Sequence, residues 1–364
     1  MNRPIKASER LSRVKRLFDP YHDRRNYVRL DRNEDPVGWS TEHFEAFRAS
    51  LTRYDFAAYA DSNDFIAKVA KWCGVTPESI LVTAGSDGAM KTLFETYVDE
   101  GDLIVMQDPS WRMYEVYNMI YKTRVAMVPY GPNLEFDTAK VLEHMRREFV
   151  RMVVLANPNQ PTGTVIPDAE IEAIIAEGAE RGTIVIMDEA YHLFTANTAV
   201  GWVNKYPNLF VVRTFSKAFG LAGLRLGYCV SNPERIRESS LLRPITDSNS
   251  IALKCGEYAL DHLDWVKQRL ADYNAGRDFL YRSMHDAGLE TFPSHTNFVH
   301  VRCKSADDCR TAIAAARERG YLLKGPWMQV PLTNCLRIST GPLDLMQRFW
   351  NDCAEIIKSA AKRR

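Results

Sequence analysis

Short apolar runs alternate with longer amphipathic segments between about residues 80 and 231. The runs are rich in valine, isoleucine and leucine, and they occupy residues 80–84, 103–106, 152–156, 184–187, 209–212 and 227–230. Near-continuous apolar strands are typical of a parallel sheet that is covered on both faces. Helical patterns such as residues 168–181 lie between the runs. The alternation therefore predicts an α/β fold with a mostly parallel central sheet.

The pattern changes after Asn249. Residues 251–286 have a long helical pattern, and later segments predict strands at 296–301 and 336–339 and helices at 306–319 and from residue 343 onward. This order predicts a smaller α+β domain at the C-terminal end. A chain of 364 residues also exceeds one ordinary core. We expect three parts: an N-terminal arm or part of the small domain (1–32), a large domain (33–270) and a small domain (271–364).

Composition narrows the possible partners. Lys plus Arg number 47 and Asp plus Glu 46, so the charge balance gives no argument for binding nucleic acid or a membrane. No stretch approaches the roughly 18 consecutive apolar residues of a membrane-spanning helix, and the charged start of the chain does not read as a secretory signal. Seven cysteines without CxxC spacing favour reduced thiols over a disulfide framework or a metal site. We expect a cytoplasmic protein without a metal ion.

Polar groups follow several of the predicted strands, and ligands of open α/β sheets bind at the carboxyl ends of strands. Gly85, Ser86 and Asp87 open a helix after the first run, where backbone N–H groups and the Ser86 hydroxyl form an anion site. Taken alone, this segment is explained as simply by Ser86 acting as a helix N-cap. Asn157 begins a rigid turn after the third run, so its amide either donates into the cleft or serves only the turn.

The fourth run ends in Asp188, with Tyr191 three residues further on. A carboxylate at the end of a buried strand is costly unless a cation pairs with it. A protonated ring nitrogen of a ligand would be such a cation, and Tyr191 would bring a phenol to the same ligand. The alternative is a structural salt bridge for Asp188 and a packed aromatic ring for Tyr191.

The fifth run is followed by Thr214, Ser216 and Lys217, with Arg225 eight residues after the lysine. Two hydroxyls and a bidentate guanidinium suit a phosphate dianion. Apolar neighbours remove water from Lys217, which lowers its pKa and favours imine formation. A lysine without such neighbours would be interpreted as a solvated surface residue. The nearby hydroxyls and the arginine favour a binding role for Lys217 instead.

Together these groups call for a ligand with a phosphate, a ring nitrogen, a ring oxygen and an aldehyde. Pyridoxal 5′-phosphate has all four. In this hypothesis Lys217 holds the cofactor as a Schiff base, and Asp188 keeps the pyridine nitrogen protonated so that the ring withdraws electrons.

The lysine segment TFSKAFGLAGLRLGY, residues 214–228, resembles that of the fold-type I aminotransferases, and most closely the histidinol-phosphate aminotransferase branch. The segments LDRNEDPVG, AGSD, NPNQPTG and DEAY resemble other motifs of this branch and follow in the family's order. The resemblance extends from about residue 20 to residue 349. It implies an aspartate aminotransferase-like fold, a homodimer, and transfer of an amino group from a donor such as glutamate to a small keto or aldehyde substrate.

The resemblance also implies further roles. Trp111 would stack on the pyridine ring, and Arg337 would clamp the substrate carboxylate. Tyr59 and Tyr21 would reach across the dimer interface, to the cofactor phosphate and to the substrate respectively, and Asn33 would border the substrate. Tyr59 stands in the sequence Ala-Tyr-Ala-Asp where the branch has Arg-Tyr-Pro-Asp.

Lys324 departs from the branch, which usually has a second arginine upstream of the carboxylate clamp. Lysine keeps the charge but loses the bidentate fork, so the site either binds a phosphate through a point charge or takes another acidic or hydroxylated substrate.

In the transamination hypothesis, Lys217 would also move the proton of the substrate α-carbon. Two alternatives stay open: a pyridoxal-phosphate-dependent decarboxylase of a phosphorylated amino acid, and a non-catalytic binding protein on the same fold.

Overall fold

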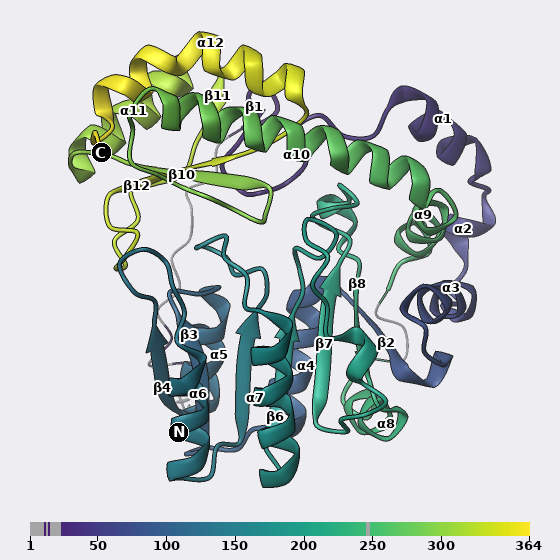
Figure 1. The fold of residues 1–364 in the computed structure, drawn as a ribbon. Helices are drawn as coiled ribbons and strands as arrows, with labels where there is room; N and C mark the ends of the chain where they lie inside the picture. The colour runs from purple at the N-terminus through teal and green to yellow at the C-terminus, as the bar shows by residue number, and fades with distance from the viewer. Residues whose placement is uncertain (1–10, 12–13, 15–22, 245–247) are drawn as a thin grey trace, which may run out of the picture.

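The computed structural model describes residues 23–244 and 248–364, together with residues 11 and 14. A seven-stranded sheet forms the centre of the lower part in Figure 1. Its strands lie in the order β2 (Ile80–Thr83), β8 (Gly227–Ser231), β7 (Leu209–Thr214), β6 (Ile184–Asp188), β5 (Met152–Ala156), β3 (Leu103–Asp108) and β4 (Arg124–Pro129).

Most neighbouring strands of this sheet are parallel. The pairs from β7 through β6, β5 and β3 to β4 are all parallel, whereas β8 is antiparallel to both of its neighbours. Only a one-turn 3-10 helix (Ala222–Leu224) lies between β7 and β8, so no helical crossover returns the chain to a parallel position. The predicted α/β fold with a mostly parallel sheet is confirmed.

Alternate residues of the strands contribute to two hydrophobic clusters on opposite faces of the sheet. In β5, Val153 and Leu155 belong to one cluster, while Met152 and Val154 belong to the other. This is the period of two that a strand buried on both faces requires. Both faces of the central strands are therefore dry, and polar groups of these strands reach the cavity at the strand ends.

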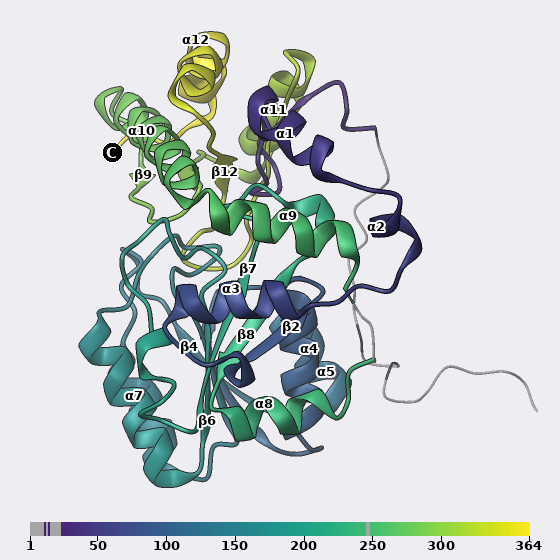
Figure 2. The ribbon, with the colours of Figure 1, turned by 90° about the vertical axis from the view of Figure 1, so that its right-hand side faces the viewer.

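Helices cover the two faces (Figure 2). One face carries α4 (Gly85–Tyr97), α5 (Met113–Tyr121) and α8 (Pro233–Ser240). The other face carries α3 (Asn63–Cys73), α6 (Thr138–Arg147), α7 (Asp168–Arg181) and α9 (Ser250–Asp261). Two further helices, α1 (Thr41–Ser50) and α2 (Tyr54–Ala57), precede α3 at the side of the molecule.

A second core lies above the sheet in Figure 1. It contains a three-stranded sheet, β12-β10-β9, a parallel pair of β1 with β11, and three helices. Their bounds are β1 (Val28–Arg29), β9 (Thr291–Phe292), β10 (Phe298–Arg302), β11 (Tyr321–Leu322), β12 (Cys335–Ser339), α10 (Leu263–Asp286), α11 (Ala306–Glu318) and α12 (Leu343–Ala360). Leu30 belongs to this core, so the chain enters it before it forms the large sheet.

Helix α10 is common to both cores. Val266 and Leu270 pack in the large core, and Leu280 and Met284 pack in the second core. The predicted boundary between the large and the small domain, at residue 270, falls inside this helix. The three predicted domain ranges remain predictions. The helical pattern of residues 251–286 forms two helices, α9 and α10, which are separated at His262.

Strand β4 was absent from the predicted runs. It pairs only with β3, at the edge of the sheet, and five of its six residues are at least partly exposed. Its sequence therefore lacks the continuous apolar character of the central strands.

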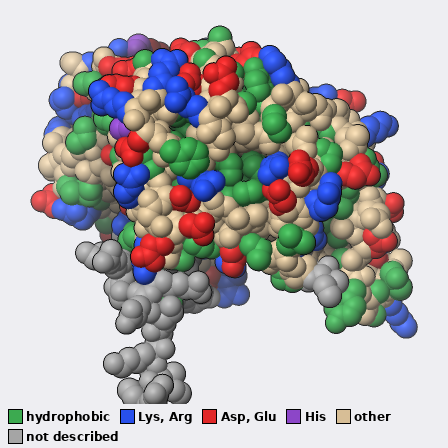
Figure 3. All heavy atoms as spheres, turned by 90° about the horizontal axis from the view of Figure 1, so that it is seen from below, with side chains coloured by type: hydrophobic (Ala, Val, Ile, Leu, Met, Phe, Trp, Pro, Cys, Tyr) green, Lys and Arg blue, Asp and Glu red, His purple; other side chains and the backbone are tan. Residues whose placement is uncertain are grey.

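Among the described residues, no helix is both long and apolar enough to cross a membrane. Figure 3 shows acidic and basic side chains mixed with one another on the face that is seen from below, in keeping with the formal net charge of +1.

Candidate active site

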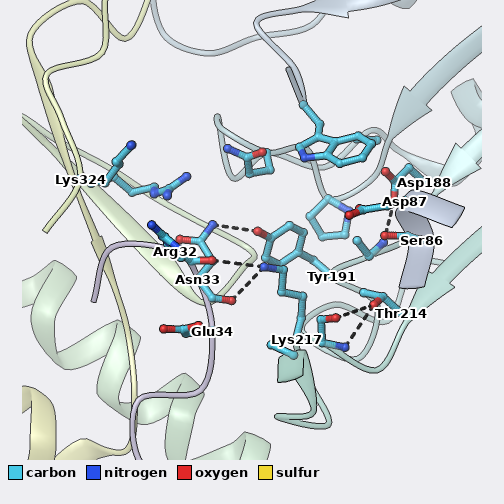
Figure 4. Close-up of a pocket in the computed structure, with 18 of the residues that line it drawn as sticks. Arg32, Asn33, Glu34, Ser86, Asp87, Asp188, Tyr191, Thr214, Lys217 and Lys324 are labelled. Carbon is cyan, nitrogen blue, oxygen red and sulfur yellow. Dashed lines mark hydrogen bonds between the residues drawn. The ribbon is translucent and has the colours of Figure 1, made fainter. Parts of the chain in front are cut away.

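A cavity of about 590 Å³ lies between the carboxyl ends of β5, β6 and β7, the segment after β1, and β12 (Figure 4). It brings together residues that are far apart in the sequence. The predicted site residues that line it are Asn33, Ser86, Asp87, Trp111, Asp188, Tyr191, Thr214, Ser216, Lys217, Arg225, Lys324 and Arg337.

Three predicted residues within the described part of the chain, Gly85, Asn157 and Tyr59, do not line this cavity. Gly85 lies just behind it with φ of +74°, and a Cβ there would come within 2.6 Å of Nη2 of Arg225. Asn157 serves the turn, one of the two roles considered for it: its Oδ1 accepts from the backbone N–H of Ile166 at 2.8 Å, and its Nδ2 donates to the Ile166 carbonyl at 3.4 Å. Donation into the cleft stays a prediction. Tyr59 is 90% exposed, and Tyr21 lies outside the described residues.

The start of α4 and the end of β7 form a cradle for an anion. Nη1 of Arg225 donates to the Ser216 hydroxyl at 3.2 Å, and the hydroxyl of Thr214 lies 3.0 Å from that of Ser216. A Cβ at Gly227 would lie 2.7 Å from the backbone nitrogen of Ser86, so glycine is required for the close approach of β8 to the helix start. Backbone N–H groups, hydroxyls and a guanidinium thus surround one small space.

Asp188 ends β6 and is buried. Its Oδ2 accepts a hydrogen bond of 2.5 Å from the hydroxyl of Tyr114, and its Oδ1 accepts one of 3.0 Å from the backbone N–H of Ala190. Burial raises the pKa of Asp188 to about 6, although the Tyr114 bond opposes this rise. A cation beside this carboxylate would favour its charged form.

Lys217 follows β7, and its Nζ donates to the backbone carbonyl of Asn33 at 3.1 Å. Burial, together with the nearby positive charge of Arg337, lowers the pKa of Lys217 to about 8. The amine is therefore neutral more often at physiological pH than an exposed lysine. This confirms that its surroundings lower the pKa, as the apolar sequence context predicted.

Asn33 links the first segment of the chain to the sheet. It has φ of +55°, and its Nδ2 donates to the hydroxyl of Tyr191 at 2.8 Å. Its Oδ1 accepts from the hydroxyl of Ser339 at 2.8 Å. Burial raises the pKa of Tyr191 to about 12, so the phenol keeps its proton at neutral pH.

Arg337 is buried in β12 between two aromatic rings, with its guanidinium carbon 5.5 Å from the ring centre of Phe298 and 5.3 Å from that of Trp327. Nη2 donates to the backbone carbonyl of Asp31 at 2.8 Å, whereas Nε has no hydrogen-bond partner among the described residues. Burial lowers the pKa of Arg337 to about 10. A buried guanidinium with an unused donor is suited to bind an anion in the cavity.

Sequence reasoning missed Tyr114 and Arg32. Tyr114 lies in helix α5, and no local pattern indicates that its hydroxyl reaches the end of β6. Arg32 lines the cavity next to Asn33, and its place in the segment LDRNEDPVG, which the sequence had already singled out, could have indicated it.

The cavity fits pyridoxal 5′-phosphate on its own chemistry. The cradle at Ser86 and Arg225 suits a phosphate, and the buried carboxylate of Asp188 suits a protonated ring nitrogen. Lys217 offers an amine of lowered pKa in the same cavity.

Comparison with known proteins agrees with this fit. Residues 25–351 match the family described as aminotransferase class I and II. The chain is 31% identical to a histidinol-phosphate aminotransferase of Caldanaerobacter subterraneus subsp. tengcongensis, over 90% of this chain and 93% of that enzyme. It is 32% identical to histidinol-phosphate aminotransferase 1 of Cupriavidus pinatubonensis, over 93% of this chain and 90% of that enzyme.

Solved structures give the same result. A histidinol-phosphate aminotransferase from Sinorhizobium meliloti in complex with pyridoxal 5′-phosphate superposes with a TM-score of 0.82, at 28% identity and 91% coverage of both chains. An aspartate aminotransferase variant from Thermus thermophilus, at 22% identity, shares the fold with a TM-score of 0.78 and covers 96% of this chain and 99% of its own. The chain therefore belongs to the class I and II aminotransferases and is a pyridoxal-phosphate-dependent enzyme.

Proposed function

We propose that this aminotransferase moves an amino group between glutamate and a small phosphorylated keto or aldehyde substrate. Support comes from relatives that are named histidinol-phosphate aminotransferases. The observation that carries the proposal is the meeting of Lys217, Asp188, Arg225 and Arg337 around one cavity. Histidinol phosphate is the first substrate to test, because named relatives match over about nine-tenths of the chain.

In this proposal the cofactor phosphate is held by the helix start at Ser86 together with Thr214, Ser216 and Arg225. Asp188 pairs with the ring nitrogen, and Trp111 packs on the ring. Tyr191 contributes its phenol, and the second N–H of the Asn157 amide, which the bond to Ile166 does not use, would donate to the ring oxygen. When bound, pyridoxal phosphate withdraws electrons from the carbon that carries the amino group.

Lys217 is the proposed covalent anchor and proton carrier. Because its pKa is lowered to about 8, its Nζ is available to take a proton from the substrate α-carbon and to return it on the same side of the cavity. Arg337 holds the substrate carboxylate in a fixed direction, and the two aromatic rings beside it restrict the guanidinium.

A homodimer is part of the proposal. Tyr54, Phe56 and Tyr59 are 74%, 73% and 90% exposed, and they follow one another on α2 and just after it. Exposed aromatic rings that gather on one surface favour an interface with another chain. Tyr59 would then reach the phosphate end of the partner subunit's site, and Tyr21 its substrate end.

We also propose a cytoplasmic location. All seven cysteines are free thiols, which supports a reducing compartment.

The function is tested with purified protein and pyridoxal phosphate. The enzyme is given histidinol phosphate and 2-oxoglutarate, and glutamate formation and carbon dioxide release are measured separately. Formation of glutamate in ping-pong kinetics is expected. A survey of phosphorylated amines and keto acids in which glutamate never forms would reject the proposal. Carbon dioxide release from a phosphorylated amino acid would favour the decarboxylase alternative.

A further inference from the structure

Three positively charged side chains line the cavity on the side away from the anion cradle: Arg32, Lys324 and Arg337. Figure 4 shows Lys324 and Arg32 across the cavity from Ser86 and Asp87, with Tyr191 and Lys217 between them. We call Arg32, Lys324 and Arg337 the basic wall.

Backbone contacts place these three residues next to one another. Lys324 and Arg337 lie opposite each other in an antiparallel bridge, with hydrogen bonds of 3.2 and 2.7 Å in the two directions. Residues in this relationship have side chains on the same face. The guanidinium of Arg337 in turn bonds the carbonyl of Asp31, the residue just before Arg32. The basic wall is thus continuous.

Two acidic residues beside the basic wall, Asp31 and Glu34, are paired with Arg24, which does not line the cavity. Nη2 of Arg24 contacts both Asp31 and Glu34, the latter at 2.7 Å. Nε of Arg29 lies 3.8 Å from Glu34. Asp31 also lies 3.7 Å from Arg32, but it shares its charge with Arg24. The substrate side of the cavity therefore keeps an excess of positive charge, which favours an anionic substrate.

Arg32 is held close to the reacting amine. Its backbone carbonyl accepts from Nζ of Lys217 at 3.4 Å, and the next residue, Asn33, is fixed by its bonds to Tyr191 and Ser339. The Arg32 side chain is 45% exposed, so a substrate that enters the cavity can reach its guanidinium. A planar guanidinium binds a carboxylate or a phosphate through two hydrogen bonds, which an ammonium group cannot do.

We propose that Arg32 is a specificity-determining residue that binds an anionic group of the substrate other than a carboxylate on the amino-bearing carbon. The ligand chemistry is an anionic oxygen group, from a distal carboxylate or a phosphate monoester. Lys324 adds positive charge to the basic wall, whereas Arg32 adds a guanidinium that can form two hydrogen bonds with one anionic group. The inference rests on the proposed aminotransferase function and names the substrate class of the same site.

The test compares holoenzymes that differ only at Arg32. Wild type, Arg32→Gln and Arg32→Lys are assayed with two matched pairs of amino donors: glutamate with glutamine, and histidinol phosphate with histidinol. We expect Arg32→Gln to lower kcat/KM for the anionic member of a pair by about 10- to 100-fold. The neutral member should change by less than about threefold, and Arg32→Lys should fall between wild type and Arg32→Gln. Arg48→Gln, on the exposed face of α1, is the matched control.

The two anion sources give different patterns. If kcat/KM of Arg32→Gln falls only for glutamate, Arg32 binds a distal carboxylate. If it falls only for histidinol phosphate, Arg32 binds a phosphate. If it falls for both donors, Arg32 binds both kinds of anionic group. An equal loss with charged and neutral donors, or no loss with any donor, would overturn the role of Arg32.

A binding measurement separates this inference from the proposed function. Calorimetry of the holoenzyme with glutarate and butyrate, which cannot donate an amino group, should show weaker glutarate binding in Arg32→Gln and little change for butyrate. Absence of turnover in the wild type would refute the proposed function, while the glutarate titration would still decide the role of Arg32. Unchanged glutarate affinity in Arg32→Gln, whose fold is checked by circular dichroism, would contradict a carboxylate-binding Arg32. Whether Arg32 binds a phosphate is tested in the same way, by calorimetry of the wild-type and Arg32→Gln holoenzymes with inorganic phosphate.

Discussion

The hydroxyl of Tyr114 lies 2.5 Å from Oδ2 of Asp188, and both side chains are buried. Tyr114 belongs to α5, which covers one face of the sheet, and Asp188 ends the central strand β6. Burial raises the pKa of Asp188, and the hydrogen bond from Tyr114 opposes that rise because it stabilises the carboxylate. Tyr114 therefore helps to set the charge of the residue that we assign to the cofactor nitrogen.

Tyr114→Phe should weaken cofactor binding most strongly near neutral pH. Loss of the hydroxyl lets the pKa of Asp188 rise above about 6, so more of the carboxyl group is protonated and cannot pair with a protonated ring nitrogen. We expect an affinity loss of about tenfold at pH 6.5 and a smaller loss at pH 8.5. Titration of apoprotein with pyridoxal phosphate at both pH values measures it. An equal ratio of dissociation constants at the two pH values would argue against this role.

Asp188→Asn should stabilise the apoprotein in a pH-dependent way. The folded pKa of about 6 exceeds the ordinary value of 3.8, so the folded state holds its proton longer than the unfolded chain. The protonated side chain of Asp188 therefore stabilises the folded wild type, fully below pH 3.8, and this stabilisation is lost as the pH rises through 6. The variant does not titrate, so its free energy of unfolding relative to wild type should increase by about 2 kcal/mol between pH 4 and pH 7. Urea unfolding at both pH values tests this, and a constant difference would refute it.

Trp327→Leu should weaken substrate binding more than it slows turnover. The variant keeps an apolar side chain but removes one of the two aromatic faces beside Arg337. A desolvated cation–π contact contributes on the order of 1–2 kcal/mol, so KM for glutamate should rise about 5- to 30-fold. Arg337→Lys, which keeps the charge without the fork, should raise KM at least as much. Steady-state kinetics that show a fall in kcat alone would count against the positioning role of Trp327.

Phe56→Asp should convert the proposed homodimer to monomers. Phe56 is 73% exposed within the aromatic group on α2, and a carboxylate there would be buried in the interface at high cost. Analytical ultracentrifugation should give one-subunit mass for this variant and two-subunit mass for the wild type. Phe149→Asp is the control, because Phe149 is 54% exposed elsewhere and should leave the mass unchanged. A monomeric wild type would contradict the dimer.

The central strands, and the lining residues that follow them directly, could be predicted because their signals are local. Strands buried on both faces give continuous apolar runs, and the polar residue after each run then marks the same edge of the sheet. Asp188 and Lys217 were found in this way, and both line the cavity. The exposed edge strand β4 lacks that signal.

Contacts between distant segments could not be predicted in this way. Tyr114 is 74 positions before Asp188, and only the packing of α5 on the sheet brings them together. Asn33 reaches Tyr191 because its positive φ turns the first segment toward the sheet. For Asn157 the sequence left two roles open, and the bonds to Ile166 form only because the turn after Asn157 brings the backbone of Ile166 to its side chain.

The site assigned to Lys217 can be measured directly. Holoenzyme is treated with borohydride, digested and analysed by mass spectrometry, with Lys217→Ala as the matched variant. We expect the reduced cofactor on the peptide that contains Lys217, and we expect Lys217→Ala to remain folded, to carry no label, and to lose at least about a thousandfold in turnover. Label on another lysine, or ordinary turnover in Lys217→Ala, would contradict the account.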